Sequence, residues 1–355
     1  MKVLGLLSDG YGCSGGIAQY NRDLVSALSE IEGVSLYVQQ IHGVEGVESV
    51  VPYEVSHSRI TFAVAAFRNV ISFRPDVILC GHINFVWLVS LANLFAKARV
   101  WLQIHGIDAF ESPGAITFHN VGKVDLVTSV SRYTRRRFIE WSRLEPERVK
   151  VLPNTFDVAL RPLTRNDLAE DLKSRYQGKK ILLTVGRLDP REAYKGHDLV
   201  IEALPELIRK NRDLVYLVVG TGEDVHRLKR LAEDKGVSEF VEFAGYVAQD
   251  CINAYLSLAD VFVMPSTLEG FGIVFLESMA AGTPVIALRG SGSDDACQDG
   301  SLGLLTTHES LVEDILSSLN TNPSKDLAQQ VDEVFGVDRF KRHVRRLLSH
   351  LERAT

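Results

Sequence analysis

Short apolar runs alternate with longer segments of helical periodicity along most of the chain. In the first half, apolar residues at helical spacing predict one helix over residues 17–31 and another that starts after Ser131. The apolar runs between the helical segments predict buried strands at Met1–Ser8, Val34–Gln39, Asp76–Cys80, Val100–Ile104 and Leu126–Ser129. Strands that alternate with helices indicate a parallel sheet with right-handed crossovers.

The same alternation resumes after a turn at Pro153-Asn154 and a polar stretch over residues 161–180. The second set of predicted strands is Ile181–Val185, Val215–Val219, Phe240–Phe243, Val261–Met264 and Pro284–Ala287. A basic amphipathic helix, Val337–Leu351, has no strand after it. The pattern therefore predicts an α/β fold in three parts: one α/β half over residues 1–164, a second over 165–334, and a helix over 335–355 that packs back on the first half.

Composition narrows the function. A chain of 355 residues favours two domains. The formal net charge of -6 argues against a nucleic-acid partner. The four cysteines form no CxxC pair and have no histidine cluster beside them, which argues against a structural zinc site and fits a reducing compartment.

Two apolar segments bear on location. Lys2 precedes only five apolar residues before Ser8, which is too few for a signal peptide, so we expect a cytoplasmic protein. The apolar region from Phe85 to Phe95 is too short to span a bilayer, and we predict that it forms a buried helix.

A glycine-rich loop follows the first predicted strand. Gly10, Gly12 and Gly15 form G-x-G-x-x-G before a helix, which is the pattern of a dinucleotide site. A dehydrogenase also needs an acid at the end of the second strand, where this chain has Gln39 and Gln40. Without that acid, the loop still predicts a phosphate site, because Gly15 and Gly16 let a phosphate approach backbone N–H groups at the start of a helix. The alternative is a tight turn with a purely structural role.

Two cations follow the first strand of the second half. Arg187 comes directly after it, and Lys195 precedes the next helix. An arginine fork and a lysine point charge at the ligand edge of a sheet suit a diphosphate, although solvated surface cations are the plainer interpretation of these two residues alone.

Two glutamates, Glu269 and Glu277, stand with seven residues between them around a Gly-Phe-Gly tripeptide. The glycines allow backbone N–H groups to point outward at the start of a helix, which predicts an anion cradle. A carboxylate next to an anion site suits a hydroxyl-rich ligand, so we expect Glu269 to bind a hexose and Glu277 a ribose. The alternative is a pair of structural helix glutamates. The expected cradle comprises Gly270, Phe271, Gly272 and Ile273.

Taken together, these residues resemble the retaining glycosyltransferases of family 4. The matching motifs, in chain order, are Gly15-Gly16, Val130-Ser131, Pro153-Asn154 with Asp157, Gly186-Arg187-Leu188, Lys195-Gly196-His197-Asp198, Phe243-x-Gly245-x-Val247, Ala259-Asp260, and Pro265-Ser266 through Pro284 with its two glutamates. The resemblance covers nearly the whole chain. It implies the GT-B fold, in which two Rossmann-like domains face each other across a cleft.

The resemblance also implies roles for single residues. A nucleotide-sugar donor is expected mainly on the C-terminal domain and the acceptor mainly on the N-terminal domain. His105 matches the family's active-site histidine, although a lone histidine is more often a core residue. The implied assignments are Arg187, Lys195 and Gly16 for the diphosphate, Glu277 for the ribose, Glu269 for the donor sugar, Tyr246 and Val247 for the base, and His105, Glu269, Arg187 and Lys195 for catalysis.

The implied reaction retains the anomeric configuration. The leaving phosphate accepts the acceptor's proton, while Arg187, Lys195 and the helix dipole stabilise the charge on the diphosphate. The chain has no D-x-D sequence, which is consistent with a reaction that needs no metal and no cofactor besides the donor. Family frequency alone favours a UDP-sugar.

This chain departs from the family pattern at two places. The segment between Arg187 and Lys195 carries an insert, Asp-Pro-Arg-Glu-Ala-Tyr, that is longer than in many members. The family's Gly-Gly-x-x-Glu sequence is replaced by residues 290–294, Gly-Ser-Gly-Ser-Asp, so the contacts to the hexose are expected to differ.

The expected acceptor is a saccharide or a lipid-linked saccharide. Residues 131–150 hold seven basic and three acidic side chains with Phe138 and Trp141 among them. This segment suits peripheral contact with the inner face of an anionic membrane, and a solvated helix face is the alternative.

Three other functions remain open from the sequence. A sugar-nucleotide epimerase of the same architecture would need further acid/base carboxylates, which the sequence does not place. A nicotinamide-dependent dehydrogenase would need the missing acid after the second strand. A non-catalytic sugar-nucleotide-binding subunit is compatible with the motifs, but the intact Arg187, Lys195, Glu269 and Glu277 favour an enzyme.

Overall fold

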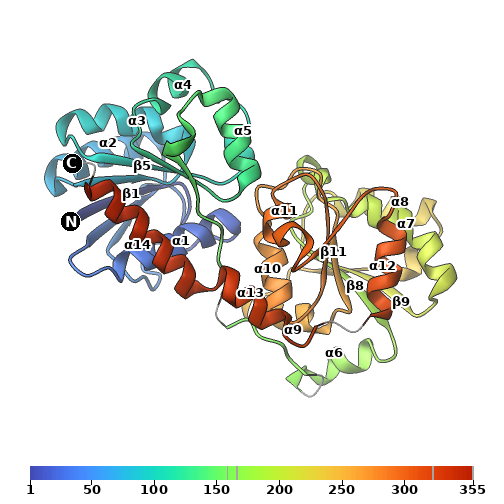
Figure 1. The fold of residues 1–355 in the computed structure, drawn as a ribbon. Coiled ribbons are helices and arrows are strands. Elements are labelled where there is room, and N and C mark those ends of the chain that lie inside the picture. Colours follow the sequence, from blue (N-terminus) through green and yellow to red (C-terminus); the bar gives the residue numbers. More distant parts are fainter. Residues whose placement is uncertain (158, 165–166, 322–323, 354–355) are drawn as a thin grey trace. The chain divides into compact units, whose positions relative to one another are not determined.

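The computed structural model describes residues 1–157, 159–164, 167–321 and 324–353 (Figure 1). The chain forms two compact units, one of Met1–Thr155 with Val337–Thr355 and one of Phe156–Gly336. The expected boundary after residue 164 falls at residues 165–166, outside the described residues. Each unit is built around one parallel sheet, which confirms the predicted α/β class.

The first unit contains a seven-stranded parallel sheet in the order β3-β2-β1-β4-β5-β6-β7. Its strands are β1 (Lys2–Leu7), β2 (Ser35–Gln40), β3 (Tyr53–Val55), β4 (Val77–Cys80), β5 (Arg99–Ile104), β6 (Leu126–Ser129) and β7 (Val149–Val151). The central strands are buried along nearly their whole length, as expected for a parallel sheet with helices on both faces.

Two helices of the first unit begin at a serine whose side chain caps them. Ser58 Oγ accepts a hydrogen bond from the N–H of Thr61 (3.1 Å) at one helix start, and Ser131 Oγ accepts one from Thr134 (2.9 Å) at another. The helices are α1 (Gly16–Ser29), α2 (Arg59–Phe73), α3 (Val86–Ala92), α4 (Ala115–Val121), α5 (Arg132–Ser142) and α14 (Val337–Arg353), with short 3-10 turns η1 (Ile83–Phe85), η2 (Asn93–Phe95), η3 (Ile107–Ala109) and η4 (Pro146–Arg148).

The second unit contains a six-stranded parallel sheet in the order β10-β9-β8-β11-β12-β13. Its strands are β8 (Lys180–Val185), β9 (Leu214–Val219), β10 (Val241–Gly245), β11 (Val261–Met264), β12 (Val285–Leu288) and β13 (Leu304–Thr306). Its helices are α6 (Glu170–Arg175), α7 (His197–Lys210), α8 (Val225–Asp234), α9 (Gln249–Leu258), α10 (Ile273–Ala280), α11 (Ser293–Ala296), α12 (Leu311–Asn320) and α13 (Leu327–Phe335), with 3-10 segments η6 (Pro190–Lys195), η7 (Ser238–Phe240) and η8 (Gln298–Gly300).

All of the strands predicted from the sequence are present, with ends that agree to within one or two residues. The strands β3, β7 and β13 were not predicted. Each has three residues, which is too short for an apolar run to be recognised. The polar stretch over residues 161–180 also contains a short helix, α6.

The apolar region from Phe85 to Phe95 corrects one expectation. It contains the helix α3, but this helix is not buried on all sides, because Trp87 and Leu91 are strongly exposed, as is Leu94 on the following turn η2. No helix among the described residues is both long enough and apolar enough to cross a membrane.

The helix α14 belongs to the first unit and lies on α1, although the whole second unit precedes it in the sequence. The Phe340 ring meets the Tyr20 ring edge-on, with 5.7 Å between the centroids. Lys341 Nζ lies 2.7 Å from the Glu30 carboxylate. The buried side of α14 is formed by Phe340, Val344, Leu348 and Leu351.

Candidate functional site

The strand order of each sheet reverses once, between β1 and β4 in the first unit and between β8 and β11 in the second. Ligands of open α/β sheets bind at the carboxyl ends of the strands beside such a reversal. Arg187 follows β8 and Glu269 follows β11, so both lie at the reversal of the second unit. Neighbouring loops are closely packed there, since a Cβ on Gly220 would lie 1.8 Å from the carbonyl oxygen of Gly186.

Arg187 and Lys195 share one carboxylate partner, Glu192, which lies between them on η6. The Arg187 guanidinium contacts Glu192 Oε1, and Lys195 Nζ lies 2.6 Å from Glu192 Oε2. Burial would raise the pKa of Glu192, but hydrogen bonds from Arg187 and Lys195 outweigh it, so the pKa lies below its usual value. The two cations that the sequence assigned to a diphosphate are therefore paired with an ionised carboxylate.

A glycine brings the Lys195 loop against the loop after β11. Gly196 has φ of 82°, and a Cβ there would lie 2.4 Å from the carbonyl oxygen of Pro265. Only glycine combines this backbone angle with such a close approach. The Lys195 charge lowers the pKa of the Glu269 carboxyl more than any other charge does.

Glu269 lies in a desolvated position at this edge of the sheet. The residue keeps part of its surface exposed, but burial of its carboxyl raises the pKa to about 7. The Lys195 charge and hydrogen bonds from the N–H groups of Gly270 and Phe271 lower the pKa only in part. Glu269 therefore changes its protonation state near neutral pH.

The loop before α10 is arranged differently from the simple anion cradle that we expected. The N–H groups of Gly270 and Phe271 hydrogen-bond the Glu269 carboxylate itself. Gly272 has φ of 86° and directly precedes the helix, whose first residue is Ile273. The N–H groups before the start of α10 are thus already used by the Glu269 carboxylate.

Glu277 lies in the middle of α10, one turn of helix after Ile273. It is partly exposed, while the flanking Leu276 and Ser278 are buried. Glu277 is therefore the one charged residue of a helix that is otherwise mostly apolar and buried.

Tyr246 and Val247 follow β10, at the outer strand of the sheet. The Gly220 N–H donates to the carbonyl oxygen of Gly245 (2.8 Å), which fixes this loop beside β9. Tyr246 is 77% exposed, so its ring is available to a ligand. Its place is two strands away from β8 along the same sheet edge.

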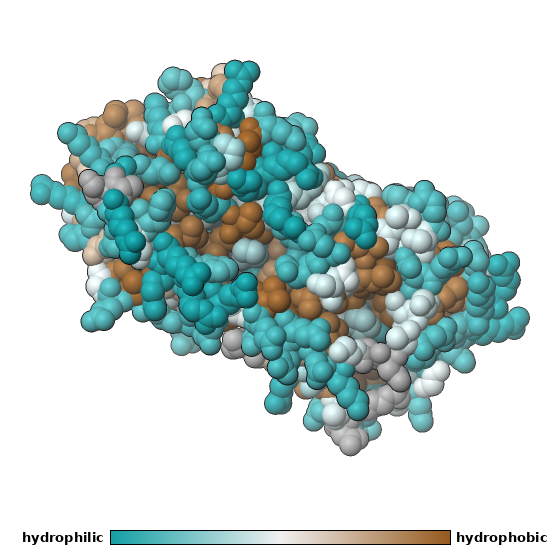
Figure 2. Space-filling model, viewed as in Figure 1, coloured by the Kyte–Doolittle hydropathy of each residue, from teal (hydrophilic) through white to brown (hydrophobic). Residues whose placement is uncertain are grey.

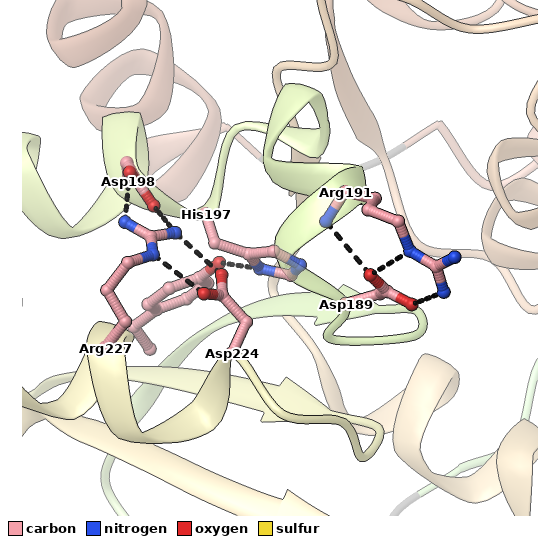
Figure 3. A network of polar contacts seen from close by, with 7 residues as sticks. Asp189, Arg191, His197, Asp198, Asp224 and Arg227 are labelled. Carbon is pink, nitrogen blue, oxygen red and sulfur yellow. Dashed lines mark hydrogen bonds and ion pairs between the residues drawn. The ribbon is translucent and has the colours of Figure 1, made fainter.

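The His197-Asp198 part of the motif anchors the helix after Lys195 (Figure 3). His197 is buried, with its Nδ1 3.1 Å from the hydroxyl of Tyr216, and burial lowers its pKa to about 4. Arg227 makes two hydrogen bonds to Asp198 (2.7 and 2.9 Å) and two to Asp224 (2.7 and 2.6 Å). These residues fix α7 to α8 and so position the loop that carries Lys195.

The glycine-rich loop of the first unit is held by Gln40. The Tyr11 N–H donates to Gln40 Oε1 (2.9 Å), and Gln40 Nε2 donates to the Tyr11 carbonyl oxygen (2.6 Å). Gln40 is fully buried, and a Cβ on Gly10 would lie 2.6 Å from its Oε1. Both ends of this buried amide hold the Tyr11 backbone, so Gln40 fixes the loop, and it is not the acid that a dehydrogenase needs at this position.

Gly15 and Gly16 form the start of α1 in the first unit. Gly15 has φ of 102° and caps the helix, of which Gly16 is the first residue. A Cβ at Gly15 would meet no atom within 4 Å, so its side faces open space. This geometry leaves room for a ligand group near the helix start.

His105 follows β5 in the first unit. Its Nε2 lies 3.0 Å from the carbonyl oxygen of Gly81, and because a carbonyl only accepts, Nε2 carries the proton and Nδ1 is free to accept. Its own N–H donates to Asp108 Oδ1 (3.1 Å), and its ring stands edge-on to Tyr20 at 5.3 Å. Burial lowers its pKa, so the ring is neutral at neutral pH.

The predicted site residues thus fall into two groups. Arg187, Lys195, Glu269 and Glu277 lie in the second unit with Tyr246 and Val247, whereas Gly15, Gly16 and His105 lie in the first. The sequence reasoning missed Glu192, and it missed Tyr194, whose pKa is raised to about 12 by burial and by the charges of Glu192 and Glu269. Both residues belong to the insert that departs from the family pattern, which was the available signal.

Part of the basic segment over residues 131–150 stabilises the fold. Arg135 Nε donates to the Val149 carbonyl oxygen (2.7 Å), and Arg148 donates to that of Gly122 (3.3 Å). Arg136 and Arg143 are exposed. Within the described ranges, no three His, Cys, Asp or Glu side chains are grouped so that they hold a metal ion.

Two family models match the chain. Residues 14–160 match "Glycosyltransferase Family 4", and residues 169–333 match "Glycosyl transferases group 1". A GDP-mannose-dependent alpha-(1-6)-phosphatidylinositol monomannoside mannosyltransferase of Mycolicibacterium smegmatis is 31% identical over 320 residues, which is 81% of each chain. A GDP-mannose-dependent monoacylated alpha-(1-6)-phosphatidylinositol monomannoside mannosyltransferase of Corynebacterium glutamicum is 31% identical over 79% of this chain and 78% of its own.

Solved structures with the same fold are more distant in sequence. Anabaena Alr3699/HepE in complex with UDP and glucose is 20% identical, with a TM-score of 0.82 over 99% of this chain and 100% of that one. Sucrose-phosphate synthase of Thermosynechococcus elongatus is 18% identical, with a TM-score of 0.78 over the full length of both chains.

Proposed function

The chain belongs to glycosyltransferase family 4, has the GT-B fold and transfers a sugar from a nucleotide sugar to a saccharide or lipid acceptor, and on this premise we propose that it is a mannosyltransferase that uses GDP-mannose. The observation that carries the proposal is the identity of 31% over about four-fifths of both chains with a relative named as GDP-mannose-dependent. The same relative's name supports a phosphatidylinositol-type lipid as the acceptor.

This proposal sets GDP-mannose against the UDP-sugar that family frequency favoured. The neighbour that holds UDP is 20% identical and supports the fold alone. The exposed Tyr246 at the outer strand offers a ring surface for either base. A UDP-sugar is therefore the competing donor that the experiment below must include.

In the proposed mechanism, the second unit binds the donor. Arg187 and Lys195 leave Glu192 and pair with the diphosphate, where they stabilise the charge that develops as the sugar bond breaks. Glu277 accepts hydrogen bonds from the ribose hydroxyls. Glu269, which is partly neutral near pH 7, binds hydroxyls of the transferred sugar.

The first unit supplies the acceptor side and His105. With its proton held on Nε2 by Gly81, the neutral ring presents Nδ1 as an acceptor to a sugar hydroxyl. We propose that no side chain forms a covalent bond with the sugar, that the leaving phosphate takes the acceptor's proton, and that the configuration is retained without a metal. The reaction would take place at the inner, cytoplasmic face of a membrane.

Titration calorimetry of the purified protein with GDP, UDP, ADP and NAD, each with and without EDTA, tests the donor. We expect GDP to bind with micromolar affinity, with no effect of EDTA and with a loss in Glu277→Ala. Transfer of radiolabelled mannose from GDP-mannose to phosphatidylinositol-based lipids tests the reaction, and NMR of the product's anomeric carbon tests retention.

Each alternative predicts a different result. UDP binding without GDP binding would replace the donor, and NAD binding alone would revive the dehydrogenase. Diphosphate binding with no transfer to any acceptor would point to a binding subunit, and interconversion of the free nucleotide sugar would point to an epimerase.

A further inference from the structure

One face of the first unit exposes large apolar side chains on α2, α3, η2 and α4. The most exposed are Ile60 (78%), Leu94 (70%) and Ile116 (70%). The helices are neighbours, and the rings of Phe67 on α2 and Phe95 on η2 lie 6.2 Å apart. Figure 2 shows brown, hydrophobic residues at the surface over α2 and α3. We call this surface the apolar face, and it comprises Ile60, Val64, Trp87, Leu91, Leu94, Phe95 and Ile116.

A groove of about 900 Å³ runs inward from the apolar face. Ile60, Trp87 and Ile116 line its outer part. Its inner part reaches Asp9 and His82, which follow β1 and β4 at the strand reversal of the first sheet. Both of these residues also act electrostatically on His105, so the inner end lies near the proposed reaction centre. An amphiphile, with an apolar chain and a polar head, matches this gradient.

The charge around the apolar face points to an anionic lipid rather than a protein. The sequences of α2, α3 and α4 contain no aspartate or glutamate. Exposed cations lie on or next to these helices, namely Arg59, Arg74, Lys97 and Lys123, whereas Arg68 on α2 is paired with Glu54. An apolar surface with a basic rim is the combination that binds the interface of a bilayer that carries negative headgroups.

We propose that the apolar face enters the surface of an anionic bilayer and that the groove takes up an acyl chain of the lipid acceptor, with the polar head at Asp9 and His82. This inference rests on the proposed lipid acceptor. It also moves the membrane contact from residues 131–150, where the sequence placed it, to the apolar face.

Trp87 provides a direct probe of this contact, because it is the exposed tryptophan of the three, and Trp101 is fully buried. We expect vesicles of phosphatidylcholine and phosphatidylinositol, with bromine atoms on their acyl chains, to quench the tryptophan fluorescence of the native protein. Trp87→Phe should remove most of that quenching while the protein still sediments with the vesicles.

A triple variant, Leu91→Ser, Leu94→Ser and Phe95→Ser, tests the face without changing the lining of the groove. The loss of three exposed apolar side chains should weaken vesicle binding by at least about tenfold. GDP affinity and thermal melting should stay as in the native protein. The matched control, Arg136→Ser, Arg143→Ser and Lys150→Ser, removes three of the four exposed cations of the 131–150 segment, leaves Arg132 in place and should weaken binding by less than about threefold.

Several results would overturn the inference. The first is that the native protein does not bind these vesicles. The second is that the triple variant binds vesicles as tightly as the native protein, while the Arg136, Arg143 and Lys150 control loses binding. The third is that the native protein is a dimer and the triple variant is a monomer. Transfer of mannose to a water-soluble acceptor without vesicle binding would end this inference and leave the proposed transferase standing. Vesicle binding with acyl-chain quenching but no GDP binding would contradict the proposed use of GDP-mannose and leave the membrane contact standing.

Discussion

Replacing Glu192 by glutamine should tighten the binding of a nucleoside diphosphate. In the free protein this carboxylate is held by both Arg187 and Lys195, and it is 13% exposed. A diphosphate that uses the same cations must displace the carboxylate or bind beside it, and either event costs free energy. Glutamine keeps the shape and a hydrogen-bond acceptor but removes the negative charge.

The size of the effect follows from Coulomb's law. Two unit negative charges about 5 Å apart repel by ~3 kcal/mol at an effective dielectric constant of about 20. Arg187 is 69% exposed, and a displaced carboxylate can turn toward water, so solvent screening reduces this value. We therefore expect about 1–2 kcal/mol, which is a roughly 5- to 30-fold lower Kd for GDP.

Titration calorimetry of GDP with Glu192→Gln and the native protein measures this change. Asp189→Asn is the matched control, since Asp189 lies on the same insert and pairs with Arg191 instead (Figure 3). The control removes the same charge and should change Kd by less than about twofold. An unchanged or weaker GDP affinity in Glu192→Gln, with unaltered thermal melting, would refute the assignment of these cations to the diphosphate.

Four further outcomes follow from the site. Glu277→Ala should weaken GDP binding by about tenfold or more through the lost ribose contact, as calorimetry would show. Arg187→Ala and Lys195→Ala should each lower turnover on the order of 10²-fold, and near-normal activity in the double variant would contradict their role. The pKa of Glu269 is raised to about 7 from a usual 4.5, so the folded protein loses stability as pH rises through that window and the buried carboxyl ionises. In urea titrations, the free energy of unfolding of the native protein should fall by about 1–3 kcal/mol between pH 5 and 8 because of this group, and Glu269→Gln should lack that fall. Gly196→Ala should destabilise the protein by about 1–3 kcal/mol, because φ of 82° is unfavourable for alanine and its Cβ meets a carbonyl oxygen, and a melting temperature equal to that of the native protein would contradict this.

Much of the fold follows from periodicity because the core strands of a parallel sheet are continuous apolar runs. The strand β11, for example, is buried at every residue and has the predicted bounds Val261–Met264. The edge strands are harder, since β3 has the sequence Tyr-Glu-Val and only its last residue is buried. Three residues with a charge in the middle carry no recognisable pattern.

The site is less predictable because pairing depends on side chains that meet only in the folded unit. Residue type and order suggested Arg187 and Lys195, but not that Glu192 lies between them. The apolar region from Phe85 to Phe95 shows a related difficulty. Apolar composition predicts burial, yet Leu94 and Phe95 lie on the surface, and only the fold distinguishes a core residue from an exposed one.

The position of α14 has a consequence for how the protein is made. A ribosome releases residues 1–155 long before it has synthesised residues 337–353, and the whole second unit is produced in between. During that interval Tyr20 lacks its Phe340 partner, and the side of α1 that α14 covers stays open to water. The second unit can fold as soon as its own residues emerge, whereas the first unit completes its core last. Nascent chains stalled before residue 337 should therefore recruit chaperones through the first unit, although it was the first to be translated.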